Sequence, residues 1–215
     1  MIISVQNQKG GVGKTTLGIH ISHALVLKKT KILKAPKVLL VDADPQGSAR
    51  DWAAARIGES PFPVVALDRP TIHRDLPELA KNFDHVVIDG PPRVSDLARS
   101  AIIAAELVVI PVQPSPYDVW AAREIVNLIA EASVFKENIK SVFVINRKIV
   151  NTAIGRDVSE ALKGFNIPVL KSAISQRVAF AESAANGQTV LETDPKSAAA
   201  KEIKALVDEL MKIEV

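Results

Sequence analysis

Residues 8–16 read Gln8-Lys9-Gly10-Gly11-Val12-Gly13-Lys14-Thr15-Thr16, a glycine-rich loop between an apolar run and a helical pattern. Only glycine lets a backbone approach a phosphate so closely that several N–H groups converge on it. In loops of this kind the lysine supplies charge to the β- and γ-phosphates, and the next hydroxyl binds Mg²⁺. The strict pattern has glycine where Gln8 stands, so this loop is a variant with Lys9 as a second cation. The stretch therefore predicts a nucleotide-phosphate site.

After this loop, short β-branched runs alternate with longer helical patterns. The expected strands are Ile2–Gln6, Lys37–Val41, Val64–Leu67, His85–Ile88, Leu107–Pro111, Ser141–Ile145 and a weak one at Pro168–Leu170. The expected helices are Thr15–Lys28, Ser48–Arg56, Thr71–Lys81, Ser95–Ala105, Asp118–Ser133, Ala153–Phe165 and Ser197–Lys212. Continuous apolar strands are covered on both faces, as in parallel sheets. The sequence predicts an α/β fold, a doubly wound, mostly parallel sheet flanked by helices, in a single domain over residues 1–215.

Composition excludes several classes of site. The 215 residues are 47% apolar and contain no cysteine, which rules out disulfides, thiolate metal sites and cysteine nucleophiles. The first apolar run ends at Gln6, too early for a signal peptide, and the longest later run is interrupted by Glu106 and Pro111. We expect a soluble, cytoplasmic protein. The four histidines are scattered, which favours packing over a metal site, and Trp52 and Trp120 are expected in the core or an interface.

The loop with its extra lysine resembles the deviant Walker A box of the ParA/MinD family of P-loop ATPases, and in particular the small plasmid partition subgroup. The resemblance implies ATP and Mg²⁺ as cofactors. It also implies that Lys9 reaches across a nucleotide-sandwich homodimer to the partner subunit's phosphates, as an arginine finger does. The nucleotide-binding residues implied in the loop are Gly10, Gly11, Val12, Gly13, Lys14, Thr15 and Thr16. Lys9 and Lys14 are expected to be catalytic.

Carboxylates follow two strands beside the loop, in the runs Asp42-Ala43-Asp44-Pro45 and Asp89-Gly90-Pro91-Pro92. Magnesium is usually held through one or two carboxylates together with phosphate oxygens. Asp89, with Thr15, is expected to hold the metal, and Asp42 to support Lys14, Thr15 or the metal shell. By resemblance to the family, Asp44 positions the attacking water. The alternative is that these residues form turns or cap helices.

Two further segments bear on the nucleotide. By resemblance, Asn146 hydrogen-bonds adenine, because an amide offers both a donor and an acceptor, and the loop around Gln176 closes over the base. The segment 111–118, which reads Pro-Val-Gln-Pro-Ser-Pro-Tyr-Asp, is either a dimer interface or switch, or a stiff connection with proline in the first helical turn. Gln46 and Ser48 either contact phosphate or cap the next helix, and Arg93 is expected in solvent.

The net charge of +3 hides two basic regions. Residues 1–41 hold seven lysines and no acid, and residues 136–204 hold eleven basic and seven acidic side chains. The basic stretch 28–37 is either a DNA-contacting loop or, as we favour, a solubilising insertion. Family members bind DNA nonspecifically when ATP has dimerised them, and such binding is strongly salt-dependent. The expected DNA contacts are Arg177, Lys171, Lys201 and Lys204.

These features favour a weak, partner-stimulated ATPase for DNA partition, associated with nucleoid DNA. The implied partners are a ParB-like centromere-binding protein or cargo adaptor, nonspecific DNA, and a second copy of the chain, with higher polymers open. The alternative is a ParA-like ATPase that positions another cargo. A MinD-like membrane ATPase is disfavoured by the acidic end 207–215, because membrane helices of that kind are basic. An iron-protein-like electron carrier needs cysteines, and a dethiobiotin synthetase-like transferase needs a substrate pocket that the sequence does not reveal.

Overall fold

The computed structural model describes residues 1–28, 35–150 and 154–214. Its strands are β1 (Ile2–Val5), β2 (Val38–Asp42), β3 (Val64–Ala66), β4 (His85–Asp89), β5 (Leu107–Val112), β6 (Lys140–Lys148) and β7 (Val169–Ser175). Its helices are α1 (Lys14–Val26), α2 (Ser48–Ala54), α3 (Ile72–Ala80), α4 (Asp96–Ala104), α5 (Pro116–Ser133), α6 (Ile154–Lys163), α7 (Val178–Ala185), α8 (Val190–Thr193) and α9 (Ala198–Leu210).

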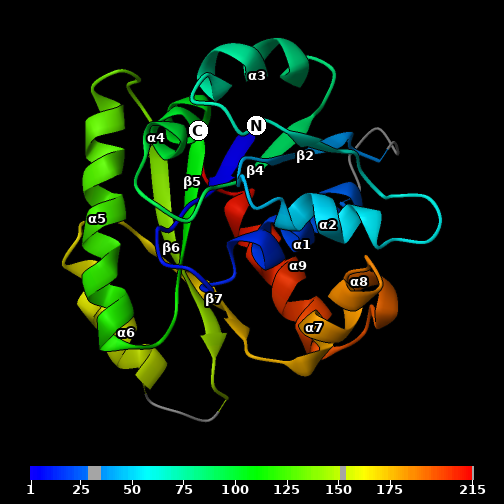
Figure 1. The fold of residues 1–215 in the computed structure, drawn as a ribbon. Helices are drawn as coiled ribbons and strands as arrows, with labels where there is room; N and C mark the ends of the chain where they lie inside the picture. The colour runs from blue at the N-terminus through cyan, green and yellow to red at the C-terminus, as the bar shows by residue number, and fades with distance from the viewer. Residues whose placement is uncertain (29–34, 151–153, 215) are drawn as a thin grey trace.

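Within the described residues, the seven strands form one parallel sheet in the order β3-β2-β4-β1-β5-β6-β7. The predicted doubly wound parallel sheet is therefore confirmed. Because β1 lies between β4 and β5, the loop after β1 stands at the centre of the carboxyl edge (Figure 1). Ligands of such sheets bind at this edge, where the winding of the chain reverses.

Helices cover both faces of the sheet (Figure 1). Alternate residues of each strand point to opposite faces, and the core divides accordingly. Leu40 and its neighbours on one face pack with α1, α2, α8 and α9. Leu39 and Val41 on the other face pack with α3 and α4, and Val108 and Ile110 pack with α4, α5 and α6. Burial on both sides is the physical reason for the continuous apolar strands.

The helices α7 and α8 were not predicted, and β7 is longer than the weak strand expected. A short, alanine-rich segment such as α7 shows little helical periodicity, and α8 has only four residues. The sequence did contain one signal for the start of α8. Thr189 and Glu192 form a capping box, each side chain bonding to the other's backbone, and this Thr-x-x-Glu spacing marks a helix start.

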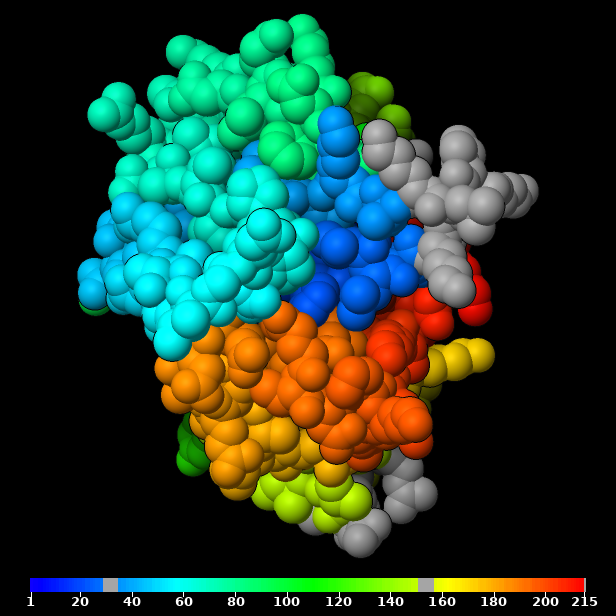
Figure 2. Space-filling model, turned by 90° about the vertical axis from the view of Figure 1, so that its right-hand side faces the viewer, coloured from blue at the N-terminus to red at the C-terminus, as the bar shows by residue number. Residues whose placement is uncertain are grey.

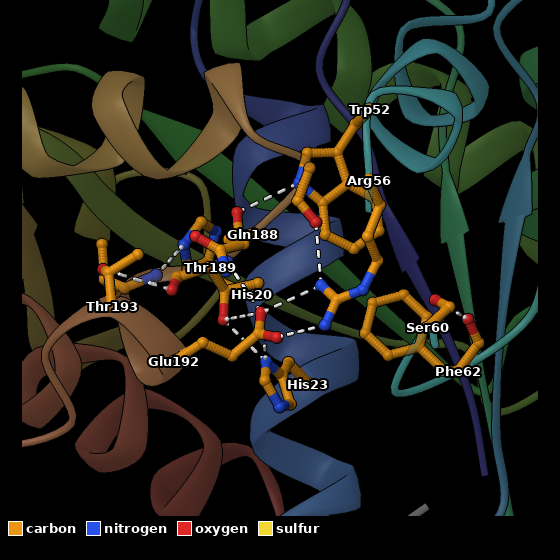
Figure 3. A network of polar contacts seen from close by, with 12 residues as sticks. His20, His23, Trp52, Arg56, Ser60, Phe62, Gln188, Thr189, Glu192 and Thr193 are labelled. Carbon is orange, nitrogen blue, oxygen red and sulfur yellow. Dashed lines mark hydrogen bonds and ion pairs between the residues drawn. The ribbon is translucent and has the colours of Figure 1, made fainter. Parts of the chain in front are cut away.

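A partly buried polar network joins α1, the segment after α2, and α8 (Figure 3). Glu192 pairs with Arg56, and the Thr189 hydroxyl lies 2.6 Å from His23 Nδ1. The backbone N–H of Val190 donates to His20 Nε2 over 3.2 Å. Figure 2 shows the result on the surface, where the orange α7–α8 segment lies directly against the blue and cyan chain around α2. The network therefore ties the late segment α7–α8 to the helix that follows the glycine-rich loop.

The sequence predicts that the histidines pack inside the protein and that Trp52 and Trp120 lie in the core or an interface. His20, His23 and Trp52 are buried, and the Trp52 indole donates to the Gln188 carbonyl. Trp120 is 67% exposed, so it is not a core residue; it lies in edge-to-face contact with exposed Tyr117 on α5. The proline segment before α5 serves as a strand-to-helix connection, with Pro116 in the first turn. Its role in a dimer interface stays a prediction.

Candidate nucleotide site

A cavity of about 960 Å³ opens at the carboxyl edge of the sheet. It is lined by the glycine-rich loop and the start of α1, together with Asp44, Gln46 and Ser48. Residues after β6 and β7, namely Asn146, Arg147, Gln176 and Arg177, and residues of α7 also line it. Its size suits a nucleotide-sized ligand. The fold thus brings together residues that are up to 174 positions apart, from Gly10 to Ala184.

The glycines of the loop have separate roles. Gly11 and Gly13 have φ angles of 73° and 94°, the left-handed region that side-chain-bearing residues avoid. The space beside Gly10 and Gly11 is open, so their backbone is accessible to a ligand, whereas a Cβ at Gly13 would clash with the Asn146 amide. Because Gly13 is the N-cap of α1, the loop presents free N–H groups and the positive end of the helix dipole to the cavity.

Three side chains from outside the loop hold its carbonyls. Asn146 donates to the Val12 carbonyl over 2.7 Å, and Gln113 and Arg147 donate to the Gly11 carbonyl over 3.1 and 3.0 Å. Fixing the carbonyls outward leaves the N–H groups free to face an anion. The roles of Gln113 and Arg147 were not predicted, because nothing in the sequence spacing links the ends of β5 and β6 to Gly11.

Lys14 begins α1 and is largely buried. Burial lowers the pKa of its ammonium, and the nearby carboxylates of Asp89 and Asp44 oppose that effect. Its Nζ lies 3.4 Å from the Lys9 carbonyl, a weak contact for a buried cation. The positive charge of this buried ammonium is therefore poorly compensated by hydrogen bonds, which suits it to an anionic ligand such as a phosphate.

Asp89, at the end of β4, carries a carboxyl group that is fully buried in the site, where a negative charge is costly. Burial raises the pKa of its carboxyl to about 7, against the effects of the nearby Thr15 hydroxyl and Lys14. Both carboxylate oxygens are buried, and neither accepts a well-formed hydrogen bond from the described residues. An orphaned carboxylate beside a threonine hydroxyl fits a hard cation with oxygen ligands such as Mg²⁺.

The carboxylates of Asp42 and Asp44, unlike that of Asp89, accept backbone hydrogen bonds. Asp42 accepts hydrogen bonds from the backbone N–H groups of Asp44 and Arg50, and Arg50 Nε lies 3.4 Å from its second oxygen. In the structure Asp42 therefore organises the turn into α2, and its expected support of Lys14, Thr15 or the metal shell stays a prediction. Asp44 accepts a hydrogen bond from the backbone N–H of Gln46, and both residues line the cavity. From this position the Asp44 carboxylate can reach a water molecule inside the cavity.

Lys9 does not extend into solvent. Its Nζ donates to Asp118 Oδ2 over 2.6 Å, and Asp118 is almost wholly buried at the start of α5. The loop is also fixed to α5 by Gln8, whose amide donates to the Ala121 carbonyl. Asp118 was predicted only as the end of the proline segment and the start of the helix Asp118–Ser133, and no sequence signal pairs it with Lys9.

The residues expected to contact DNA divide into two groups. Lys171, Lys201 and Lys204 are exposed, on β7 and α9. Arg177 is half-buried, lines the cavity and pairs with Glu202 over 2.7 Å, and its contact with DNA stays a prediction. Of the basic stretch 28–37, Lys29, Lys31 and Lys34 lie outside the described residues; Lys28 pairs with Asp208. Arg93 is exposed, as expected.

Comparisons with known proteins agree with this geometry. Residues 3–190 match the model of the CobQ/CobB/MinD/ParA nucleotide binding domain. The chain is 29% identical to the maintenance of carboxysome distribution protein A of Halothiobacillus neapolitanus, over 97% of this chain and 95% of that protein. It is 28% identical to the chromosome-partitioning ATPase Soj of Thermus thermophilus, over 97% and 94% of the two chains.

A solved structure supports the fold. A McdA variant from Cyanothece in complex with ATP superposes with a TM-score of 0.79 over 100% of this chain and 97% of that one, at 16% identity. At such identity the likeness establishes the shared architecture.

Proposed function

The chain belongs to the CobQ/CobB/MinD/ParA nucleotide-binding family, and from this premise we propose that it is a ParA-type ATPase that positions an intracellular cargo. The proposal rests above all on one observation: the glycine-rich loop, Asp44 and the orphaned carboxylate of Asp89 meet at one edge of the sheet. That arrangement offers separate places for phosphates, for a metal ion and for an attacking water. It is the arrangement that nucleotide hydrolysis requires.

In this proposal the N–H groups before α1 and the Lys14 ammonium bind the β- and γ-phosphates of ATP. Thr15 and Asp89 hold Mg²⁺, which offsets charge on the phosphates. Asp44, at the turn after β2, orients the water that attacks the γ-phosphate. Lys9 leaves Asp118 and reaches the phosphates of a second copy of the chain, so that ATP stabilises a dimer.

The ATP dimer binds DNA nonspecifically through exposed lysines, and hydrolysis stimulated by a partner protein returns it to monomers. Two cargoes fit this cycle. The similarity to a chromosome-partitioning ATPase supports DNA segregation with a ParB-like partner, whereas the similarity to a carboxysome distribution protein supports a protein compartment with its own adaptor. The site is common to both, so the partner decides between them. Stimulation of ATP turnover by the product of the neighbouring gene is the direct assay.

The membrane alternative receives less support. Within the described residues, no helix is both long and apolar enough to cross a bilayer. The apolar side chains of α9, among them Ile203, Leu206 and Leu210, are buried in the core. That helix therefore has no free apolar face with which to lie in a membrane interface.

The proposal is tested by measuring the rate of ATP hydrolysis and the oligomeric state of the protein. We expect slow ATP hydrolysis that depends on Mg²⁺, and sedimentation as a dimer with ATP but as a monomer with ADP. Lys14→Ala should bind neither nucleotide. Lys9→Ala should bind ATP yet stay monomeric. A wild-type protein that stays monomeric with ATP and Mg²⁺ would contradict the proposed cycle.

A further inference from the structure

Arg50, in the first turn of α2, folds back over the turn that carries Asp44. Its Nη2 donates to the Asp44 carbonyl over 3.4 Å, and its Nε lies 3.4 Å from Asp42 Oδ2. The same oxygen of Asp42 accepts the Arg50 backbone N–H over 3.0 Å. Both the backbone and the side chain of Arg50 therefore tie α2, the cyan helix after β2 in Figure 1, to residues 42–44.

Gly47 allows the guanidinium of Arg50 to lie so close to this turn. Its φ angle is 73°, and a Cβ at this position would stand 2.9 Å from Arg50 Nη2 and 3.2 Å from Cζ. A side chain would push the guanidinium away, whereas glycine permits both the left-handed backbone and the close approach. The Gly47 N–H also donates to the Asp44 carbonyl over 2.9 Å. That carbonyl thus accepts hydrogen bonds from both Gly47 and Arg50.

Two carboxylates, those of Asp42 and Asp68, fix the position of the guanidinium. Asp42 is fully buried, so its pairing with Arg50 compensates a charge that water does not reach. Asp68, which follows β3, lies 3.9 Å from Nη2. The side chains of Asp68 and Arg50 are each 39% exposed, so this outer contact directs the guanidinium more than it stabilises the fold.

We propose that Arg50 is a positioning residue for ATP hydrolysis, which holds the turn 44–47 so that the Asp44 carboxylate faces the attacking water. Arg50 acts here on the water-orienting role of Asp44, so this assignment rests on the proposed function. Arg50 is not among the residues that line the cavity, whereas Asp44, Gln46 and Ser48 are. It therefore acts through the turn and not by contact with the nucleotide.

The direction of the Asp44 carboxylate depends on this turn. The hydrogen bond that it accepts comes from the Gln46 N–H, inside the turn, and the Asp44 N–H donates to Asp42 Oδ1 over 3.1 Å. Within the described part of the chain, no side chain bonds to the Asp44 carboxylate, so the backbone of residues 42–47 sets where it points. A misplacement of about 1 Å at a reacting group can lower turnover on the order of a hundredfold. A small movement of the turn is therefore sufficient to slow hydrolysis.

The phosphate loop has a separate support. Its carbonyls are held by Asn146, Gln113 and Arg147, which lie near the ends of β5 and β6. Arg50 holds the turn after β2 instead. A change at Arg50 is therefore expected to slow turnover while nucleotide binding persists.

Arg50→Lys distinguishes positioning from simple neutralisation of Asp42. Lysine keeps a positive charge near Asp42, but its compact ammonium cannot contact Asp42 and the Asp44 carbonyl while also covering Gly47, as the planar guanidinium does. If Arg50 only neutralised Asp42, the lysine variant would keep both stability and turnover. Arg69→Lys is the matched control, because it makes the same chemical change at an exposed position next to Asp68.

The experiment measures three properties of the full chain: ATP turnover at saturating ATP and Mg²⁺, ADP binding by calorimetry, and sedimentation with ATP. For Arg50→Lys we expect turnover roughly tenfold lower, ADP affinity within about twofold of the wild type, and accumulation of the ATP dimer. Arg69→Lys should match the wild type in all three. Urea unfolding checks that both variants fold.

The same change in an Asp44→Ala background tests whether Arg50 acts through Asp44. Effects of residues that act as a unit are not additive. The double variant should therefore hydrolyse ATP at the rate of Asp44→Ala alone. A further decrease in the double variant would show that Arg50 acts by another route and would overturn the assignment.

The outcomes separate this inference from the proposed function. A wild type that neither binds ADP nor hydrolyses ATP contradicts the nucleotide site itself, and the role of Arg50 falls with it. If the wild type hydrolyses ATP and Arg50→Lys does so at the same rate, the site stands and the role of Arg50 is overturned. Equal losses of ADP affinity and turnover also overturn it, because they place the effect of Arg50 at nucleotide binding. An Arg50→Lys protein that does not fold assigns Arg50 to stability and overturns it as well.

Discussion

Lys9 Nζ donates a hydrogen bond to Asp118 Oδ2 over 2.6 Å, so the additional lysine of the loop is paired within its own chain. The lysine side chain is 39% exposed and the aspartate 2%. The pair joins the loop after β1 to the first turn of α5, where a carboxylate also interacts favourably with the helix dipole. If Lys9 acts across a dimer, this contact must break first. Asp118 then sets how readily the chain dimerises.

Asp118→Asn should favour the ATP dimer, because it weakens the contact that competes for Lys9. Half-exposed ion pairs contribute at most about 1 kcal/mol, so the concentration for half-dimerisation should fall roughly fivefold. Sedimentation with ATP and Mg²⁺ measures this change. An unchanged or higher midpoint, with the variant folded, would show that the pair does not restrain Lys9.

Asp44→Ala should separate ATP binding from hydrolysis. Loss of a water-orienting carboxylate typically lowers turnover on the order of a hundredfold, while the phosphate contacts of Lys14 remain. The variant should therefore accumulate as the ATP dimer in sedimentation, with little phosphate released. Asp51→Ala, at an exposed position of α2, is the control and should behave as the wild type. A monomeric Asp44→Ala protein in ATP and Mg²⁺ contradicts the role assigned to Asp44.

Asp89→Asn should stabilise the nucleotide-free protein and abolish its response to magnesium. The buried carboxylate lacks a hydrogen-bond partner among the described residues, so removing its charge relieves a desolvation cost. A gain of a few degrees in Tm is expected, since each kcal/mol corresponds to roughly 2–4 °C for a chain of this size. Addition of Mg²⁺ with ADP should then raise Tm in the wild type only. A lower Tm for the ligand-free variant argues that Asp89 is already satisfied.

His20 should lower stability as the pH drops below about 6.5, whereas the raised pKa of the Asp89 carboxyl acts in the opposite direction. His20 Nδ1 lies 2.7 Å from the Thr16 carbonyl and its Nε2 accepts the Val190 N–H, so the buried ring is neutral. Burial lowers its pKa from 6.5 to about 4 in the folded chain. Between these values the unfolded chain binds the proton and the folded chain does not, so the contribution is complete above pH 6.5 and is lost on the way down to about 4.

Urea unfolding at several pH values measures this slope, whose His20 part amounts to roughly 3 kcal/mol at most. Burial lowers the pKa of His23 as well, which acts in the same direction. His20→Gln should be less stable at pH 7.5 yet show a flatter dependence between pH 6.5 and 4. An unchanged slope in the variant would assign the acid sensitivity to other groups.

Replacing Lys171, Lys201 and Lys204 together by alanine should weaken DNA binding of the ATP form without changing ATP turnover. All three are exposed. Each lost phosphate contact lowers the slope of log affinity against log salt by about 0.9, so a decrease of roughly 2–3 is expected. Lys81→Ala on α3, also exposed, serves as the control. An unchanged salt slope in the triple variant moves the DNA surface elsewhere.

Much of the phosphate end of the site could be read from local sequence. The order strand, glycine loop, helix specifies an anion site because backbone N–H groups, the helix dipole and the lysine all lie within residues 10–16. Asp89 was recognised for a similar reason, since it directly follows an expected apolar strand, whereas the role of Asp44, three residues after such a strand, came from the resemblance to the family. The continuous apolar runs also predicted the parallel sheet. Each of these signals is contained within about ten consecutive residues of the chain.

The remaining contacts join residues that the sequence separates widely, and only folding brings them together. Lys9 meets Asp118 because β5 lies beside β1, and Arg147 meets Gly11 because β6 lies beside β5. Glu202 meets Arg177 because α9 packs along the edge strand β7. Sequence patterns indicate which residues are buried and which are exposed. The partner of a charged residue, in contrast, depends on strand order and helix packing. For that reason the sequence named Arg177 both beside the loop expected to close over the base and among the expected DNA contacts, and only the tertiary structure showed that it lines the cavity and pairs with Glu202.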